Sequence, residues 1–252
     1  MVEPLVIRDL RKRLGAREVL AGIDLTLKRG DWLGFLGANG AGKSTFLRCL
    51  SGELYFQGQV LLGTQVLDGD ALRAHVGYAV APERLPEALT GAQVLRLVSA
   101  ARTGSDDWFA QLDAPAQDWS RRLDLAAALD RTMATASLGM RQKIALVAAC
   151  LGAPQCLLLD EALDALDPLA GAHTKQFLAE GCAARRFAVL FAAHAIEQVE
   201  RWCTRVALLA DGRIVQQWEP EELSRLRQGP GLESEVLHCL QQHADAQSSR
   251  AG

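Results

Sequence analysis

The distribution of hydrophobic and polar residues predicts strands of two kinds. Residues 4–10 and 20–30 alternate apolar with polar side chains, which is typical of half-exposed antiparallel strands. Residues 31–37, 156–160 and 188–194 are short, continuous apolar runs, as expected of strands that are covered on both faces. We therefore expect a buried, parallel core sheet that is preceded by antiparallel strands.

Helical and turn patterns fill the rest of the chain. Between residues 86 and 154 the strand pattern disappears and Ala, Leu and Arg dominate, so this segment is predicted to be a helical insert. Residues 205–218 form two strand-like runs around Asp211 and Gly212, which indicates a hairpin. The polar residues 241–252 are expected to form a frayed tail. Strands that alternate with helices in this way favour an α/β protein.

Composition narrows the class of protein. With 252 residues, 49% of them hydrophobic, the chain can bury one substantial core, with or without a smaller subdomain. Its formal net charge of -3 gives no basic footprint, so nucleic acid is not expected as a partner. No apolar run reaches the roughly 18 residues that span a bilayer, and no signal-peptide pattern is present, so the chain is expected in the cytoplasm. The six cysteines are scattered and are expected to be reduced.

One glycine-rich stretch, GANGAGKST, predicts a phosphate-binding loop. It follows an apparent buried strand and precedes a helix-like segment. Glycine has no Cβ, so the backbone can curl and direct successive N–H groups inward at the positive end of the helix dipole. In such a loop the Lys43 amine reaches the β- and γ-phosphates and the Ser44 hydroxyl coordinates Mg²⁺. The predicted nucleotide-binding residues here are Gly37, Ala38, Asn39, Gly40, Ala41, Gly42, Lys43, Ser44 and Thr45.

Two carboxylates, Asp160 and Glu161, end a second buried strand. At that edge of a parallel sheet they would emerge beside the phosphate loop. Asp160 is predicted to hold Mg²⁺, usually through water, and Glu161 to accept a proton from the attacking water. An apolar strand that ends in acids can also be a capped surface turn, which is the alternative interpretation.

These motifs resemble those of the ABC-type ATPases over residues 5–218. GFLGANGAGKST is similar to their Walker A segment, LLLDEALDALDP to their Walker B segment and D-loop, and ASLGMRQKIALVAACLGAP to their signature motif and its helix. The resemblance implies an α/β, RecA-like P-loop NTPase fold. Its mixed, mainly parallel core sheet would carry an N-terminal antiparallel β subdomain and an inserted α-helical subdomain.

The same resemblance divides the chain into two parts. Residues 1–218 would form the ATPase domain, with the helical subdomain at about 86–154 inserted in the catalytic core. Residues 219–252 would form a short C-terminal extension with a flexible tail.

The resemblance also implies roles for residues outside the phosphate loop. In the signature, Ser137, Gly139 and Met140 would contact nucleotide, with Leu138 where the first glycine usually stands. His194 matches the switch histidine that contacts the γ-phosphate. The predicted catalytic residues are therefore Lys43, Glu161 and His194.

The D-loop residue Asp167 would help two nucleotide sites communicate. An acidic helix cap before Pro168 is the alternative role.

Three positions depart from the family pattern. Leu14 stands where an aromatic residue usually stacks on adenine, and Arg11 or Arg13 is a candidate substitute. Glu83 stands in place of the Q-loop glutamine and would add a carboxylate near Mg²⁺ and the catalytic base. We therefore predict that Glu83→Gln shifts the pH optimum of hydrolysis. Ala162 follows the base where Pro is common, with little expected effect.

The resemblance implies ATP and Mg²⁺ as cofactors and two kinds of partner. In this family the signature of one subunit faces the phosphate loop of another, so ATP would join two ABC ATPase subunits, identical or different, and hydrolysis would release them. An integral membrane permease would hold the chain at the inner face of the cell membrane. The expected function is the motor subunit of a multi-chain transporter, and the forms at Glu83 and Leu138 favour an exporter.

Two alternatives remain open at the sequence level. One is a non-transport ABC ATPase in DNA repair or translation, although such proteins typically carry two cassettes or long coiled coils. The other is a catalytically weak, scaffolding subunit, which only Leu14 and Glu83 support.

Overall fold

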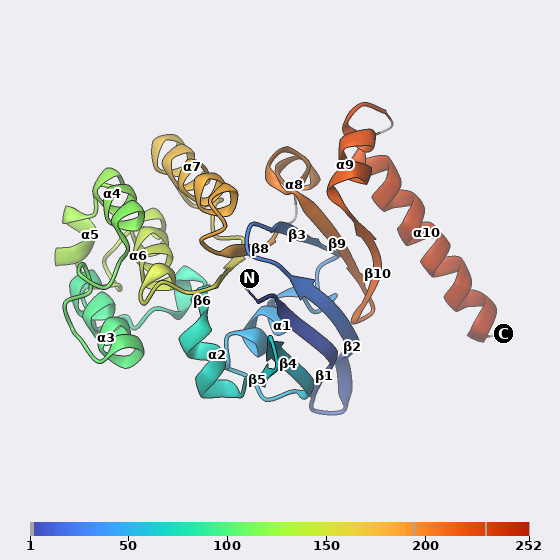
Figure 1. Cartoon of the computed structure of the whole chain (residues 1–252), viewed down its shortest axis with the longest axis horizontal. Coiled ribbons are helices and arrows are strands. Elements are labelled where there is room, and N and C mark those ends of the chain that lie inside the picture. The colour runs from blue at the N-terminus through green and yellow to red at the C-terminus, as the bar shows by residue number, and fades with distance from the viewer. Residues whose placement is uncertain (1–2, 194, 230, 252) are drawn as a thin grey trace.

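The computed structural model describes residues 3–193, 195–229 and 231–251. In this part of the chain the strands form two sheets, with helices between and outside them (Figure 1). The α/β class, the mainly parallel core and the N-terminal antiparallel strands that were predicted from the sequence are confirmed.

The antiparallel sheet has the strand order β2-β1-β4-β5. Its strands are β1 Leu5–Leu14, β2 Arg17–Leu27, β4 Gln57–Leu62 and β5 Gln65–Val66. β1 pairs antiparallel with β2 on one side and with β4 on the other. Of the four strands, β4 and β5 were not predicted, because their polar sequences bury only one side chain fully, that of Val60.

The core sheet has the order β10-β9-β3-β8-β7-β6. Its strands are β3 Trp32–Leu36, β6 Val76–Ala79, β7 Cys156–Asp160, β8 Ala188–Ala192, β9 Arg205–Ala210 and β10 Arg213–Trp218. All neighbours in this sheet pair in parallel except β9 and β10, which form the predicted hairpin. The three apolar runs become β3, β7 and β8, and their side chains are buried with the exception of Asp160.

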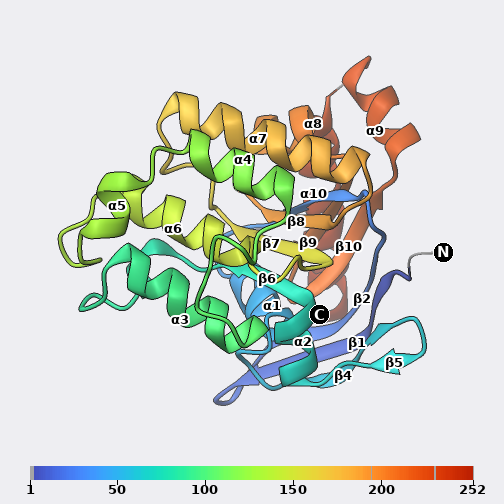
Figure 2. The same ribbon diagram turned by 60° about the vertical axis from the view of Figure 1, so that its left-hand side comes forward.

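Successive residues of a core strand face different helices. In β7, Leu158 belongs to one apolar cluster with the antiparallel sheet and α1 (Lys43–Leu50), in which Phe46 is fully buried. Leu157 and Leu159 belong to a second cluster with the helices on the opposite face. Those helices include α7 (Pro168–Ala183) and α8 (Ile196–Trp202), and Figure 2 shows α1 and the antiparallel sheet below the core sheet with α7 and α8 above it. This two-sided burial explains why the runs contain no alternating polar residues.

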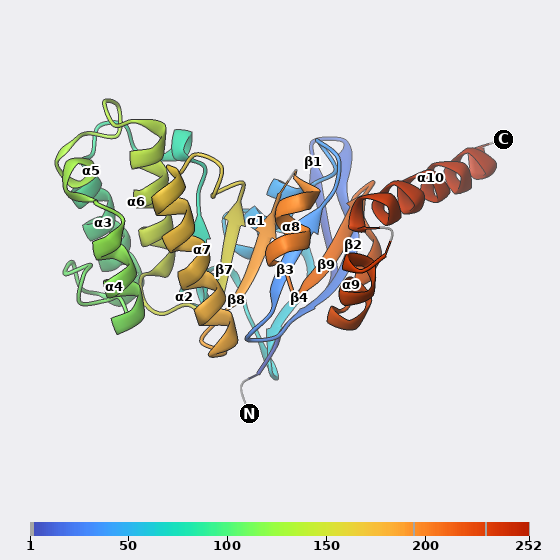
Figure 3. The same cartoon turned by 90° about the horizontal axis from the view of Figure 1, so that it is seen from above.

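The helical insert lies at one end of the molecule (Figures 1 and 3). It contains α3 Gly91–Thr103, α4 Ala114–Arg122, α5 Ala126–Asp130 and α6 Leu138–Cys150, and a short 3-10 turn, Pro82–Arg84, precedes it. One more helix, α2 (Gly69–His75), leads into β6. All of residues 86–154 are described, and they contain no strand beyond a single bridge between Thr90 and Thr132.

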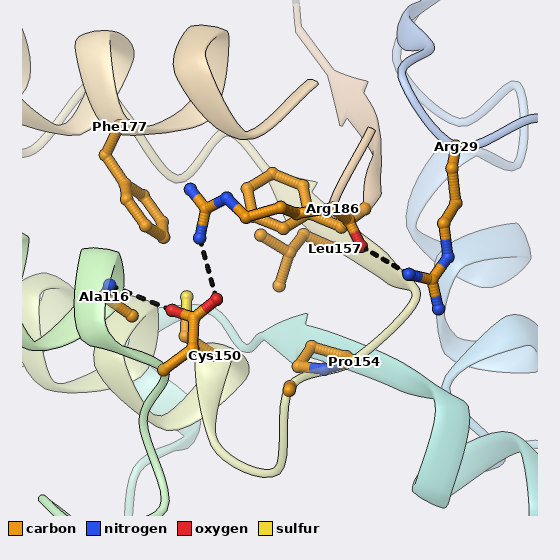
Figure 4. Close-up of a pocket in the computed structure, with 10 residues that line it drawn as sticks. Arg29, Ala116, Cys150, Pro154, Leu157, Phe177 and Arg186 are labelled. Carbon is orange, nitrogen blue, oxygen red and sulfur yellow. Dashed lines mark hydrogen bonds and ion pairs between the residues drawn. The ribbon is translucent and has the colours of Figure 1, made fainter. Parts of the chain in front are cut away.

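Aromatic and ionic contacts join the insert to the core. Trp119 of α4 stacks on Phe177 of α7, with ring centroids 4.5 Å apart. Beside this pair lies a cavity of about 210 Å³, in which Arg186 pairs with Asp113 at 2.8 Å and Arg29 donates a hydrogen bond to the Arg186 carbonyl at 3.0 Å (Figure 4). These contacts hold the insert against α7 and the segment that leads into β8.

The C-terminal extension consists of α9 (Pro220–Arg227) and α10 (Leu232–Ala251), at the end of the molecule opposite the insert (Figure 3). The sequence predicted a frayed tail at residues 241–252, but the structure continues α10 through Ala251. Residues 232–251 contain neither Gly nor Pro, so the backbone of the helix has no breaker. Leu232 and Val236, buried to 0% and 4% exposure, attach the helix to the core.

Among the described residues, no helix has both the length and the apolar character needed to cross a bilayer.

Candidate functional site

The glycine-rich loop lies between β3 and α1, as predicted. Gly42 is the N-cap of α1 with a φ of 114°, and a Cβ at this position would lie 2.8 Å from a Leu20 methyl carbon. A Cβ at Gly37 would lie 2.5 Å from the Leu209 carbonyl oxygen. Larger residues therefore do not fit at either end of the loop. The first turn of α1 contains no acidic residue, so its free N–H groups can attract an anion.

The Lys43 side chain folds back into the loop. Its amine donates hydrogen bonds to the carbonyl oxygens of Gly37 at 2.6 Å and Ala38 at 3.2 Å, and the residue is only 6% exposed. Burial lowers the pKa of the amine, and the charges of Glu161 and Asp160 partly oppose this change. A buried ammonium that is held only by carbonyls is a strong binding partner for phosphate oxygens.

A cavity of about 430 Å³ brings the predicted polar residues together. Ser44, Glu83, Asp160 and Glu161 line it, and Gln142 of α6 lines it too. These residues come from four separate segments of the sequence, and the structure places the first four where the motifs predicted one site.

Backbone geometry fixes the position of the Glu161 carboxylate. Its N–H donates a hydrogen bond to the Ala192 carbonyl of β8 at 3.0 Å. The residue has a φ of 53°, a left-handed conformation that residues with a side chain rarely adopt and that is often found at functional sites. Glu161 is therefore directed into the cavity by the end of β7 instead of continuing the strand.

The oxygen donors in this cavity fit Mg²⁺. This ion prefers oxygen ligands and is typically bound by one or two carboxylates together with substrate phosphates. The Ser44 hydroxyl and the Asp160 carboxylate are such donors, and the Oδ1 atom of Asp160 is buried without a hydrogen-bond partner. Within the described ranges, no group of three or more His, Cys, Asp and Glu side chains is placed to hold a metal alone. The arrangement suits a cation that is shared with a phosphate ligand.

The signature residues lie at the start of α6. Ser137 is the N-cap, and its hydroxyl accepts a hydrogen bond from the Met140 N–H at 3.2 Å. Leu138 is 50% exposed and lines the cavity together with Gln142. Ser137, Gly139 and Met140 are not among the residues that line it. The three signature residues predicted to bind nucleotide therefore do not line this cavity of their own chain.

Asp167 has a local structural role. Its carboxylate caps α7 by accepting a hydrogen bond from the Ala170 N–H at 2.9 Å, and it pairs with Lys143 of α6 at 3.0 Å. The backbone hydrogen bond from Ala170 is the main cause of a lowered Asp167 pKa, with Lys143 contributing. The alternative role of helix cap is thus present, and a role between subunits stays a prediction.

Comparison with protein families gives a match to the family described as ABC transporter, over residues 20–164. The match covers more than half of the 252 residues. The chain belongs to the ABC transporter family. Within this family it corresponds to the ATP-binding subunit, and its activity is ATP hydrolysis coupled to transport.

Individual relatives of this ABC ATPase agree with the family match. The chain is 35% identical to the aliphatic sulfonates import ATP-binding protein SsuB 3 of Pseudomonas syringae pv. syringae over 84% of this chain and 74% of that protein. It is 31% identical to the hemin import ATP-binding protein HmuV of Bordetella avium over 92% of this chain and 94% of that protein. Among solved structures, an ATP-binding subunit of an ABC transporter has a TM-score of 0.81 and 26% identity, covering 95% of this chain and 100% of that chain.

Two further predictions concern the switch histidine and the residue that usually stacks on adenine. His194, the predicted switch histidine, lies outside the described residues. Leu14, at the usual aromatic position, is 45% exposed at the end of β1. Arg13 donates a hydrogen bond to the Ala16 carbonyl at 2.6 Å, and Arg11 pairs with Asp9 at 2.9 Å. The hypothesis that one of these arginines contacts the base stays a prediction.

The sequence placed Gln142 in the signature motif but did not predict a role for it at the site. This side chain is 2% exposed, lines the catalytic cavity, and has an Nε2 atom without a hydrogen-bond partner. Gln142 lies between Arg141 and Lys143, just before the apolar run that starts at Ile144, so its burial is not evident from the sequence. Because buried amides normally have partners, its unpartnered Nε2 atom identifies it in the structure.

Proposed function

We propose that this ABC ATPase is the motor subunit of a multi-chain transporter, which binds Mg²⁺-ATP and powers a separate membrane permease. The observation that carries the proposal is the single cavity lined by Ser44, Asp160 and Glu161 beside the Lys43 loop. Each of these side chains has the chemistry that phosphoryl transfer to water requires.

The proposed roles follow from the positions of the side chains. Lys43 exchanges its carbonyl partners for phosphate oxygens and stabilises negative charge there. Ser44 and Asp160 would hold Mg²⁺, which when bound neutralises charge on the phosphates. Glu161 orients a water molecule and accepts its proton.

In this proposal a second subunit completes the site. Ser137 is exposed at the start of α6 and does not line the cavity of its own chain, so in the proposal it reaches the ATP of another subunit. Exposed apolar side chains flank this region, with Leu138 50% and Leu169 65% exposed. A second copy of this chain is the simplest partner, and a related subunit is the alternative.

The permease and the direction of transport belong to the proposal as well. The P-E form at Glu83 and the S-L-G-M form around Leu138 support an exporter, whereas the names of the relatives SsuB 3 and HmuV point to import. Export is the prediction that we retain for testing. Accumulation of substrate in inside-out vesicles would support it, and accumulation only in right-side-out vesicles would contradict it.

Steady-state ATP hydrolysis tests the proposed chemistry. We expect wild-type protein to release phosphate from ATP when Mg²⁺ is present, and Glu161→Gln to lose about 100- to 10,000-fold in rate, as expected for loss of a general base. Glu87→Gln, an exposed carboxylate outside the cavity, is the matched control and should retain the rate. Equal rates for Glu161→Gln and wild type would contradict the assignment.

The weak, scaffolding subunit is a second candidate, supported by Leu14 and Glu83 at the usual aromatic and glutamine positions. It predicts that wild-type protein binds ATP but hydrolyses it no faster than Glu161→Gln. The same assay therefore separates the two functions.

A further inference from the structure

A second cavity, of about 480 Å³, borders the phosphate loop. Residues 38–41 of the loop, 17–19 of β2 and 209–212 of the β9–β10 turn line it. The remaining wall comes from α10, through Leu240, His243 and Ala244. The C-terminal extension thus reaches the phosphate loop, although more than 190 residues separate them in the sequence.

This cavity lies on the side of the loop opposite the catalytic carboxylates. In the sheet order, β9 neighbours β3 on one side, whereas β8 and then β7, which carries Asp160, lie on the other side. A nucleoside triphosphate with its γ-phosphate near Asp160 and Glu161 would have room for its nucleoside in this cavity, on the β9 side of the loop. The volume is within the usual range for small-ligand sites.

One face of α10 carries the residues that place this helix against the core and the cavity. Leu232, Val236, Leu240 and His243 recur at helical spacing and so share one face of α10. Leu232 and Val236 are buried against the core, and the Leu232 N–H donates a hydrogen bond to Glu200 of α8 at 3.0 Å. The buried half of the helix holds the next two positions of the same face against the cavity.

His243 supplies an oriented ring. Its Nε2 atom lies 2.9 Å from the Asp211 carboxylate of the β9–β10 turn, and its side chain is 25% exposed. Among the described residues that line the cavity, it carries the one aromatic ring. Val19 and Leu240 add apolar surface nearby. A flat ring beside aliphatic side chains is the kind of surface on which a nucleobase stacks.

We propose that α10 forms the base-side wall of the nucleotide site and that the His243 ring stacks on the base of bound ATP. This inference rests on the proposed binding of triphosphate by the loop of residues 37–45. The C-terminal extension would then contribute to nucleotide affinity, and His243 would supply the aromatic contact that Leu14 cannot make.

Binding measurements on the full chain test this inference with two probes. One is Mg²⁺-ATP, and the other is Mg²⁺ with inorganic tripolyphosphate, which has the phosphates but no base. We expect His243→Ala to raise the Kd for ATP about tenfold, as expected for the loss of one stacking contact, and to leave the Kd for tripolyphosphate unchanged. His243→Phe keeps a ring and should restore much of the ATP affinity. Leu237→Ala, at an exposed α10 position outside the cavity, is the matched control.

Other outcomes would overturn the inference. Unchanged ATP binding by His243→Ala, or equal losses for ATP and tripolyphosphate, would show that α10 does not contact the base. Failure of His243→Phe to bind ATP better than His243→Ala would remove the stacking role. Absence of ATP binding by the wild-type chain would instead refute the proposed function itself, so the two failures are distinguishable.

Discussion

At the scale of single residues, the Lys43 amine is the most constrained group of the phosphate loop. It is buried, and its two hydrogen bonds go to carbonyl oxygens of the phosphate loop. To bind ATP, the amine must exchange these partners for phosphate oxygens. We predict that Lys43→Ala raises the Kd for Mg²⁺-ATP about 10- to 100-fold, because it removes a charge-assisted hydrogen bond. Fluorescence titration measures this effect. Lys28→Ala, at an exposed position on the same chain, should bind like wild type, and equal affinity of both variants would contradict the role of Lys43.

Residue-level chemistry could be predicted where a motif is local in sequence. The loop of residues 37–45 and the pair Asp160–Glu161 needed only the pattern of a buried strand followed by particular side chains. That Gln142 and His243 line these cavities could not be predicted in this way. Their positions depend on which faces of α6 and α10 meet the cavities, and this is decided by packing between distant elements.

At the scale of secondary-structure elements, Asp167 connects α6 to α7 through its cap and its pair with Lys143. These contacts lower its pKa below the ordinary value of 3.8. The charged carboxylate therefore stabilises the fold fully above pH 3.8, and this contribution is lost as the pH falls through the lower folded-state pKa.

We therefore predict a pH-dependent effect of Asp167→Asn, which keeps a capping oxygen but removes the charge. Its Tm should be below that of wild type at pH 7, and the difference should shrink as the pH is lowered below 3.8. Thermal unfolding across this range measures it. Asp106→Asn, an exposed carboxylate, should show no such difference, and a Tm deficit for Asp167→Asn that is the same at every pH would contradict the prediction.

Arg205 joins elements at the start of the core sheet. Its guanidinium donates hydrogen bonds to the Thr26 carbonyl at 2.8 Å, to Asp31 at 2.7 Å and to Glu219 at 2.8 Å, and the residue is 9% exposed. The Arg205 guanidinium of β9 thus connects β2, the residue before β3 and the N-cap of α9.

We predict that Arg205→Leu lowers the free energy of unfolding by about 3 kcal/mol, because it leaves the Asp31 carboxylate, whose side chain is only 15% exposed, without its charged partner. Urea denaturation measures this change. Arg213→Leu, on the exposed face of β10, is the control, and an equal effect of both substitutions would contradict the prediction.

Elements with a strong pattern were predicted, and elements held by tertiary contacts were not. The fully apolar β3, β7 and β8 were evident, whereas β4, β5 and β6 are short or polar and form because neighbouring strands pair with them. The helix at residues 241–251 was expected to fray. Its sequence has helix-compatible residues but only a weak apolar face, and the contacts of Leu232 and Val236 anchor it.

At the scale of the whole molecule, only part of the signature meets the catalytic cavity of its own chain, through Leu138 and Gln142. The fold places the insert at one end and α10 at the other (Figures 1 and 3). Residues of the insert line the catalytic cavity, and residues of α10 line the second cavity. Ser137 does not line the cavity of its own chain. In the proposed mechanism, Ser137 of a second subunit therefore contacts the ATP bound in this cavity. The resemblance of the sequence to ABC-type ATPases predicted a second subunit. The sequence of one chain does not determine whether that subunit is a second copy or a related protein.

The most direct test is the molecular mass in solution of Glu161→Gln, measured by size-exclusion chromatography with light scattering, with and without Mg²⁺-ATP. The account predicts a monomer without nucleotide and a stable dimer with ATP, because binding is retained while hydrolysis is blocked. Adding Ser137→Arg to the same variant should abolish the dimer and leave ATP binding intact. A Glu161→Gln protein that binds ATP and yet stays monomeric at saturation, or that still hydrolyses ATP at the wild-type rate, would contradict it.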